Sequence, residues 1–179
     1  ICLDQESHQY ISIKRTEQDE IIYYPMPGEI NEVLLDPNGK YAWIIYESMA
    51  IEFSLETNEE IVRYVPKEKI LKAVVNENNL YLAIEGEPGI TVIDSNGKEK
   101  TIIFDLASRI ETFFVKDNNK MVAVMKDKNR QDWASVYCNY KKFKTIPLEQ
   151  TEDLRFNVLY DEMKNMWCVI SSDGFGLAF

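Results

Sequence analysis

The sequence predicts an all-β fold assembled from small, repeated antiparallel sheets, and three observations lead to this prediction. A polar turn flanked by two apolar runs recurs at intervals of about 40 residues. The runs are short, and many of them alternate apolar with polar residues, which is the period of a half-buried strand. All six prolines fall at or beyond the ends of these runs, where no hydrogen bond of a sheet is lost.

The composition limits the class of protein. The chain has 179 residues, of which 45% are hydrophobic and 12% aromatic, so it can bury a core and is not intrinsically disordered. No apolar run approaches the roughly 20 residues of a transmembrane helix, and residues 1–7 do not form a signal peptide. The net charge of -10 argues against nucleic acid and anionic membranes. We therefore expect no nucleic acid as partner and no membrane insertion. Other protein subunits are the expected partners, on the fold argued below.

The first half of each repeat is predicted to be a hairpin of two strands, named a and b. Its copies occupy residues 35–44, 75–84, 115–124 and 159–169, and the units begin at Ile30, Ile70, Ile110 and Leu154. The last copy is displaced by 44 residues up to its turn, which aligns Leu159 with Val115, and by 45 residues after it. Asn38-Gly39 and Asn78-Asn79 supply residues that tolerate φ > 0, as tight turns require.

The second half of each repeat adds two more strands, named c and d. Strand c is expected at residues 11–13, 51–53 and 91–93, again at spacings of 40. Strand d is expected at residues 21–24, 61–64, 101–104 and 143–146, after polar turns. Helix is expected only in short pieces, near residues 105–109 or 149–153.

Four short strands in about 40 residues, repeated, is the pattern of a β-propeller blade, with strand a innermost and strand d outermost. Complete blades are expected at residues 29–68, 69–108 and 109–152, with the end of a blade at 1–28 and the start of another at 153–179. A β-sandwich is the alternative. A sandwich, however, has no reason to keep a 40-residue register through three successive units.

Two arrangements of these blades are open. The two ends could share one blade and close a four-bladed ring, which would remove exposed sheet edges. Alternatively, the chain is an excerpt of a larger ring of about six to eight blades. Residues 1–7 align with strand b, so the two ends overlap by about one strand, and this overlap favours the excerpt.

The motif Asp-Pro-Asn-Gly-Lys-Tyr at residues 36–41, followed by an apolar strand, resembles the inner hairpin of YVTN-like and WD-repeat propellers. Residues 90–98, with Asn96-Gly97 in the turn, are similar to the outer hairpin of these families. The resemblance covers most of the chain as a pattern, and it implies the same propeller architecture.

The predicted partner-binding site is the loop between strands b and c of the third complete unit, which is about four residues longer than its counterparts. Arg and Trp are enriched among interface hot spots. The alternative is a solvated loop in which the tryptophan begins a packed strand. The candidate partner-binding residues are Lys126, Asp127, Arg130, Asp132 and Trp133.

The sequence offers little for catalysis, so we expect no enzyme activity, no cofactor and no metal. His8 is the only imidazole, and the three cysteines show no C-x-x-C spacing, which argues against a Ser-His-Asp triad, a zinc site or a disulfide framework. A calcium loop at residues 127–138 fails, because Asp132 and Cys138 stand where an EF-hand needs Gly and Glu.

Lys141, Lys142, Phe143 and Lys144 follow Tyr140 and form the one basic, aromatic cluster of the sequence. Such a mixture can bind single-stranded nucleic acid through charge and stacking. In a chain of net charge -10 we expect it instead to be a solvated turn, or a charged guard on an exposed outer strand.

The predicted function is a non-catalytic propeller that serves as a protein-interaction platform, as part of a larger scaffold or assembly subunit. An acidic surface would favour partners with basic patches. One alternative is a propeller enzyme, a lactonase-like or lyase-like hydrolase, with Asn31, Lys72, Glu111 and Arg155 as channel candidates. Another is a carbohydrate-binding surface propeller. Because no N-glycosylation sequon occurs, we expect a cytoplasmic protein, with an extracellular location left open.

Overall fold

The computed structural model describes residues 2–3, 10–14, 21–104, 107–116, 120–138, 141–148, 155–172, 174 and 176–178, and within these residues it is all strand, turn and loop. The strands form five antiparallel sheets in chain order. The first has β1 (Cys2–Leu3), β2 (Tyr10–Lys14) and β3 (Ile21–Pro25); the second has β4 (Glu32–Leu35), β5 (Tyr41–Ile45), β6 (Ala50–Ser54) and β7 (Glu60–Tyr64). The third has β8 (Ile70–Asn76), β9 (Asn79–Ile84), β10 (Gly89–Ile93) and β11 (Glu99–Ile103); the fourth has β12 (Arg109–Lys116), β13 (Lys120–Lys126), β14 (Asp132–Cys138) and β15 (Lys141–Pro147). The fifth has β16 (Phe156–Asp161), β17 (Met166–Ser171) and β18 (Gly176–Ala178).

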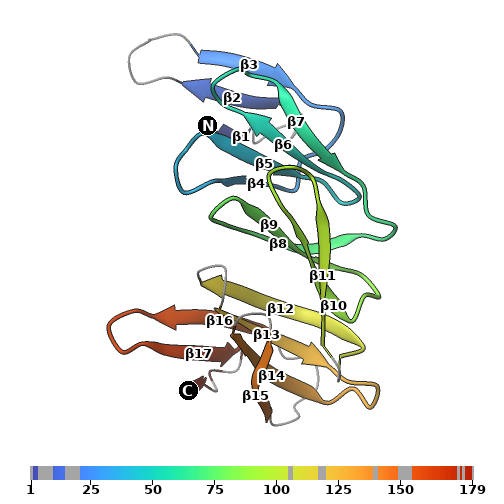
Figure 1. Ribbon diagram of the computed structural model, residues 1–179, viewed down its shortest axis with the longest axis vertical. Helices are drawn as coiled ribbons and strands as arrows, with labels where there is room; N and C mark the ends of the chain where they lie inside the picture. The colour runs from blue at the N-terminus through green and yellow to red at the C-terminus, as the bar shows by residue number, and fades with distance from the viewer. Residues whose placement is uncertain are drawn as a thin grey trace.

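The sheets follow one another along the long axis of the molecule (Figure 1), and each is a meander in which strands adjacent in sequence pair with each other. The first strands of successive sheets lie against one another: β4 contacts β8, and β12 contacts both β8 and β16. The last strands, β7, β11 and β15, are largely exposed. Strand a is therefore innermost and strand d outermost, which confirms the predicted β-propeller and excludes the sandwich.

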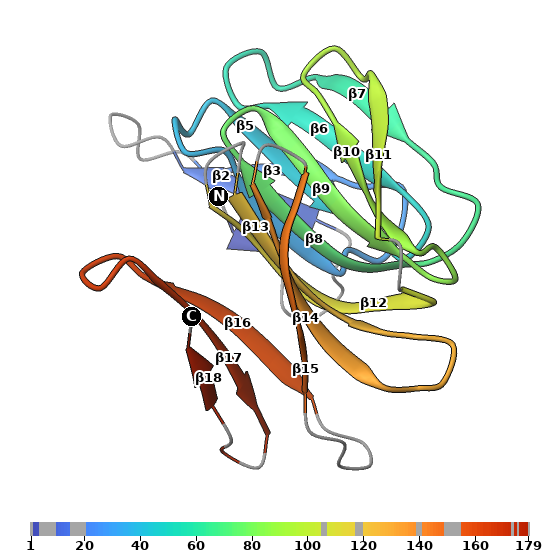
Figure 2. The same cartoon turned by 60° about the horizontal axis from the view of Figure 1, so that its bottom comes forward.

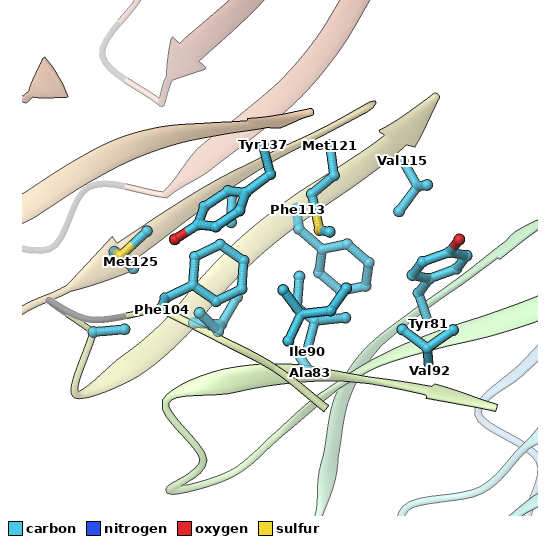
Figure 3. Packing of buried hydrophobic residues seen from close by; sticks show 14 residues of the cluster. Tyr81, Ala83, Ile90, Val92, Phe104, Phe113, Val115, Met121, Met125 and Tyr137 are labelled. Carbon is cyan, nitrogen blue, oxygen red and sulfur yellow. The ribbon is translucent and has the colours of Figure 1, made fainter. Parts of the chain in front are cut away.

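Four hydrophobic clusters hold the array together, one between each pair of successive sheets. The cluster between the third and fourth sheets is the one drawn in Figure 3. There Phe113 of β12 packs among Ile90, Phe104 and Tyr137, and the last two rings meet edge-on with centroids 4.4 Å apart. The second, third and fourth sheets bury both faces, which is why their strands b and c are apolar along most of their length.

Leu35, Val75 and Val115 occupy the same register position on strand a, as the 40-residue repeat predicts. They pair with Ala42, Leu80 and Met121, in that order. In the third and fourth sheets a β-bulge follows at the same place, one residue after Ile70 and Ile110. The turns from strand a to strand b differ in length, so the repeat is kept by strand pairing and bulges rather than by loop length.

The alignment of Leu159 with Val115 is wrong by one residue. Val158 and Tyr160 pack into the cluster shared with the fourth sheet, whereas Leu159 lies on the opposite face and is 51% exposed. Side chains of a strand alternate between faces, so Tyr160 is the structural counterpart of Val115. Short helices are expected near residues 105–109 or 149–153. In the first segment Arg109 begins strand β12. Residues 105–106 and 149–153 lie outside the described part.

The described residues form an open arc and not a four-bladed ring, with the first and last sheets toward opposite ends of the long axis (Figure 1). The outer face of the first sheet exposes Tyr10, Ile21 and Tyr23, and that of the last sheet exposes Leu159 and Ile170. Both uncovered faces thus present large apolar side chains, as do the faces buried between sheets. This is the geometry of part of a larger propeller.

Candidate functional site

The predicted site is the loop that joins β13 to β14, and hydrogen bonds that Asp127 accepts determine its shape. The Asp127 carboxylate accepts the backbone N–H groups of Asn129 at 2.8 Å and Gln131 at 2.9 Å. The Arg130 N–H in turn donates to the Asp127 carbonyl at 3.1 Å. These hydrogen bonds stabilise the charged carboxylate and so lower the pKa of Asp127, and the bond from the Gln131 N–H contributes most. The loop is therefore a closed, internally bonded turn.

The same turn occurs twice more among the described residues. The carboxylates of Asp36 and Asp94 also accept backbone N–H groups two and four residues further on. In these two turns the residue three positions after the aspartate is Gly39 (φ 65°) or Gly97 (φ 74°). In the β13–β14 loop that position is Arg130, with φ 64°.

Arg130 thus occupies a backbone conformation that favours glycine. A residue with a Cβ in the left-handed region costs about 1 kcal/mol or more, and such residues cluster at functional sites. Sequence reasoning singled out Arg130 but missed this strain. The signal was present in the printed sequence, because Asp-x-Asn-Gly at residues 36–39 and 94–97 becomes Asp-x-Asn-Arg at 127–130.

Four of the five predicted site residues hold the loop in place. The Trp133 Nε1–H donates to Asp127 Oδ2 at 3.2 Å, and the indole packs against the core between the third and fourth sheets. Lys126 Nζ donates to both carboxylate oxygens of the buried Asp132, at 2.8 and 3.0 Å. Among the five, Arg130 alone is exposed, and its guanidinium makes no hydrogen bond or ion pair with a described residue.

The loop is also shorter than predicted. The connection from β13 to β14 spans residues 127–131, against 46–49 and 85–88 in the two preceding sheets. Most of the additional residues extend the ladder instead, through the pairs Met125–Trp133 and Lys126–Asp132. Arg130 therefore lies at the tip of a stiff, extended hairpin. Ser108, from the β11–β12 connection, donates from its hydroxyl to the carbonyl of Asp127 and lies on the same side of the sheet.

Of the four channel candidates, only Lys72 takes part in a contact between inner strands. Its ammonium donates to Thr112 Oγ1 at 2.7 Å, from β8 to the same register position on β12. Burial lowers the pKa of Lys72, and the negative charge of the nearby Glu32 partly opposes this shift. Burial likewise raises the pKa of Glu32, and the positive charge of Lys72 partly opposes that shift. Glu32, Lys72 and Thr112 thus form a polar row along the inner edge of three sheets.

The other three channel candidates do not join this row. Glu111 accepts a hydrogen bond from Arg109 Nε at 2.5 Å, and the side chains of Asn31 and Arg155 are exposed. Within the described ranges, no group of three or more His, Cys, Asp or Glu side chains could hold a metal ion. Cys138 and Cys168 are free thiols, and His8 lies outside the described residues.

A shallow recess of about 240 Å³ opens where β8, β12 and β16 end, lined by Asn76, Phe114, Val115, Lys116, Tyr160 and Glu162. The Lys116 ammonium lies 3.6 Å from the centre of the Tyr160 ring and 3.8 Å from a Glu162 oxygen. The cation at the recess is therefore already engaged within the molecule.

Among the described residues, the structure contains no helix with the length and hydrophobicity that a membrane span requires.

No protein-family model and no curated protein sequence matches this chain. Solved structures do resemble it. The WD40 β-propeller domain of Doa1 has 13% identity and a TM-score of 0.66, covering 96% of this chain and 59% of that one. The WD40 domain of coronin from Toxoplasma gondii has 8% identity and a TM-score of 0.63, covering 84% of this chain and 47% of that one.

A third structure is the dihydro-heme d1 dehydrogenase NirN, with 13% identity and a TM-score of 0.69, covering 97% of this chain and 39% of that one. The chain thus spans about half the length of the structures that it resembles. At these identities the likeness shows the fold, a WD-like β-propeller. The similar structures include WD40 domains and a dehydrogenase. The role of this chain is therefore argued from its own residues.

Proposed function

We propose that this propeller is a non-catalytic protein-interaction platform, part of a larger scaffold or assembly subunit, and that it contacts a partner through Arg130. The observation that carries the proposal is the backbone of Arg130, which has φ 64° at a turn position that is glycine in both equivalent turns. An exposed side chain that strains its own backbone has no stabilising role in the fold, which points to a role outside it.

The surroundings of Arg130 suit a contact residue. Asp127, Trp133, Lys126 and Asp132 hold the loop before any partner arrives, so little conformational entropy is lost on binding. The guanidinium carries five N–H donors in a planar fork that matches carboxylate geometry. We therefore expect Arg130 to bind a carboxylate or a cluster of carbonyl oxygens on the partner.

Arg130→Gly is the sharpest test, because glycine adopts the left-handed backbone freely and leaves the turn intact. Tagged wild-type protein and the variant are used to capture partners from cell extract, and the captured proteins are quantified. We expect at least one partner to fall about tenfold or more in the variant, as for a hot-spot arginine. Lys128→Ala, an exposed cation in the same loop, is the matched control and should not change capture of that partner.

The stability of the variant separates the two roles of this residue. We expect Arg130→Gly to unfold at the same or a higher denaturant concentration than the wild type, with a gain of up to about 1 kcal/mol. An unchanged set of captured partners in a stably folded Arg130→Gly variant would remove Arg130 from the proposed interface.

A further inference from the structure

The fourth sheet differs in charge from the rest of the molecule. Residues 109–152 contain nine Lys and Arg against six Asp and Glu, whereas the remainder of the chain contains 11 against 24. An otherwise acidic chain thus carries one basic segment. Three of these nine residues are lysines within four residues of β15, the outer strand.

β15 is an exposed edge strand. It pairs with β14 on one side only and ends its sheet, so its outer backbone groups face away from the fold (Figure 2). At seven residues it is longer than the outer strands β3, β7 and β11, which have five each. All four residues of the segment Lys141 to Lys144 are exposed.

Phe143 is the unusual member of this segment. It is the additional residue of a β-bulge, since Val136 pairs with Lys144 and Tyr137 pairs with Lys142. Its side chain is 75% exposed and stands between two lysines. A bulge redirects a side chain away from the sheet, and here it directs a large aromatic ring to the solvent.

Lysines and a bulge on an edge strand also guard against edge-to-edge pairing. The other outer strands show what such a guard requires. β7 carries Glu60 and Arg63 in an ion pair of 2.6 Å, and β11 places Glu99 beside Lys100. β15 carries no acidic residue, and it exposes an aromatic ring, which is larger than the isoleucine side chains that β7 and β11 expose. Lysines on both sides of an apolar anchor, on a strand without acidic residues, are the composition of a binding surface.

We propose that the outer edge of β15 binds an extended acidic segment of a partner protein. Lys141, Lys142 and Lys144 pair with its carboxylates, and Phe143 packs between its apolar side chains. The strand edge is extended and solvent-facing, so it fits a peptide in β conformation running alongside it. The surface is separate from Arg130, which lies in the loop at the far end of β14.

The test uses a fluorescent peptide of about twelve residues made of Glu-Val-Glu-Asp repeats, with binding followed by fluorescence anisotropy at low and at near-physiological salt. We expect measurable binding that weakens as salt is added, because the contact is electrostatic in part. The double variant Lys141→Glu/Lys144→Glu should weaken binding by about tenfold or more, and Phe143→Ser by about fivefold. Lys67→Glu/Lys98→Glu changes the same charge on exposed residues of the β7–β8 and β10–β11 connections, and should stay within about twofold of the wild type.

Three results would overturn the proposal, provided that circular dichroism shows folded variants. One is the absence of peptide binding by the wild-type protein, which leaves β15 as a guard. Another is equal binding by the β15 variant and its control. The third is tighter binding of a single-stranded DNA of equal charge, lost in the β15 variant, which would make the edge a nucleic-acid surface. Arg130→Gly should bind the peptide as the wild type does, so failure here and failure of the loop contact are distinguishable.

Discussion

Glu52 on β6 is a carboxylic acid inside the fold. It is 3% exposed, it stands directly opposite Trp43, and its Oε2 atom has no hydrogen-bond partner among the described residues. Burial, with a smaller contribution from the nearby Asp36 carboxylate, raises its pKa to about 7. The folded protein therefore holds a proton here that the unfolded chain, with an ordinary carboxyl pKa of 4.5, releases earlier.

We predict that the free energy of unfolding falls as pH rises from about 4.5 to about 7, because the native state binds more protons than the unfolded state in this window. Glu52→Gln should remove this dependence and stabilise the protein at pH 8 by up to about 3 kcal/mol, with little change near pH 5. Urea unfolding at several pH values measures both effects. Glu68→Gln, an exposed control, should keep the wild-type pH profile; a profile unchanged by Glu52→Gln would contradict this account.

Gly89 shows a second constraint on a single residue. A Cβ added here would lie 2.5 Å from the carbonyl oxygen of Ile102, so the close approach of β10 to β11 requires glycine. We predict that Gly89→Ala destabilises the fold by about 2 kcal/mol, as overpacking does. Gly28→Ala, whose added carbon meets only Tyr46 at 3.9 Å, is the matched control in denaturant unfolding. Equal stability of the two variants would show that the strands are further apart than described.

The turns between strands depend on a shared element, an aspartate that accepts backbone N–H groups. Asp36 accepts three, from Asn38, Lys40 and Tyr41, and is 6% exposed, whereas Asp94 accepts two and is less buried. Hydrogen bonds to charged groups stabilise more than neutral ones, and buried donors left unpaired cost the most. The inner turn should therefore be the more sensitive one.

We predict that Asp36→Ala lowers the free energy of unfolding by about 2–3 kcal/mol and Asp94→Ala by about 1 kcal/mol. The two substitutions remove the same side chain from the same kind of turn, so each is a control for the other. Urea unfolding with a constant slope measures the difference. A cost for Asp94→Ala as large as that for Asp36→Ala would mean that burial of the acceptor is unimportant.

The sequence indicates these turns because their chemistry is local: Asp, Asn and Gly at fixed offsets leave few backbone alternatives. It misplaces Leu159 by one residue, because the facing of a strand depends on the neighbouring sheet and not on the turn before it. It also overestimates the length of the β13–β14 loop. Met125 and Trp133 pair and extend the two strands, but the charged residues between them in the sequence are typical of a loop. The inward contacts of Lys126, Asp127 and Asp132 depend on tertiary structure and could not be predicted from spacing.

For the whole molecule, the arrangement of sheets was predictable and its chemistry was not. A strict repeat of apolar runs fixes four strands per unit, and sheets with two apolar faces must stack in series. The hydrogen bond between Lys72 and Thr112, however, joins residues 40 positions apart whose side chains meet only once the sheets are stacked. The strain at Arg130 likewise emerges only when three turns are compared as backbones.

The central claim is that successive units are sheets stacked face to face around a common inner edge. Three aromatic pairs mark three of the interfaces: Tyr24 with Phe53, Phe104 with Tyr137, and Phe114 with Trp167. Their ring centroids lie 5.4, 4.4 and 5.8 Å apart. A NOESY spectrum with assigned aromatic protons should show a cross-peak within each of the three pairs. Absence of these cross-peaks from a folded, well-dispersed spectrum would contradict the stacked-sheet architecture.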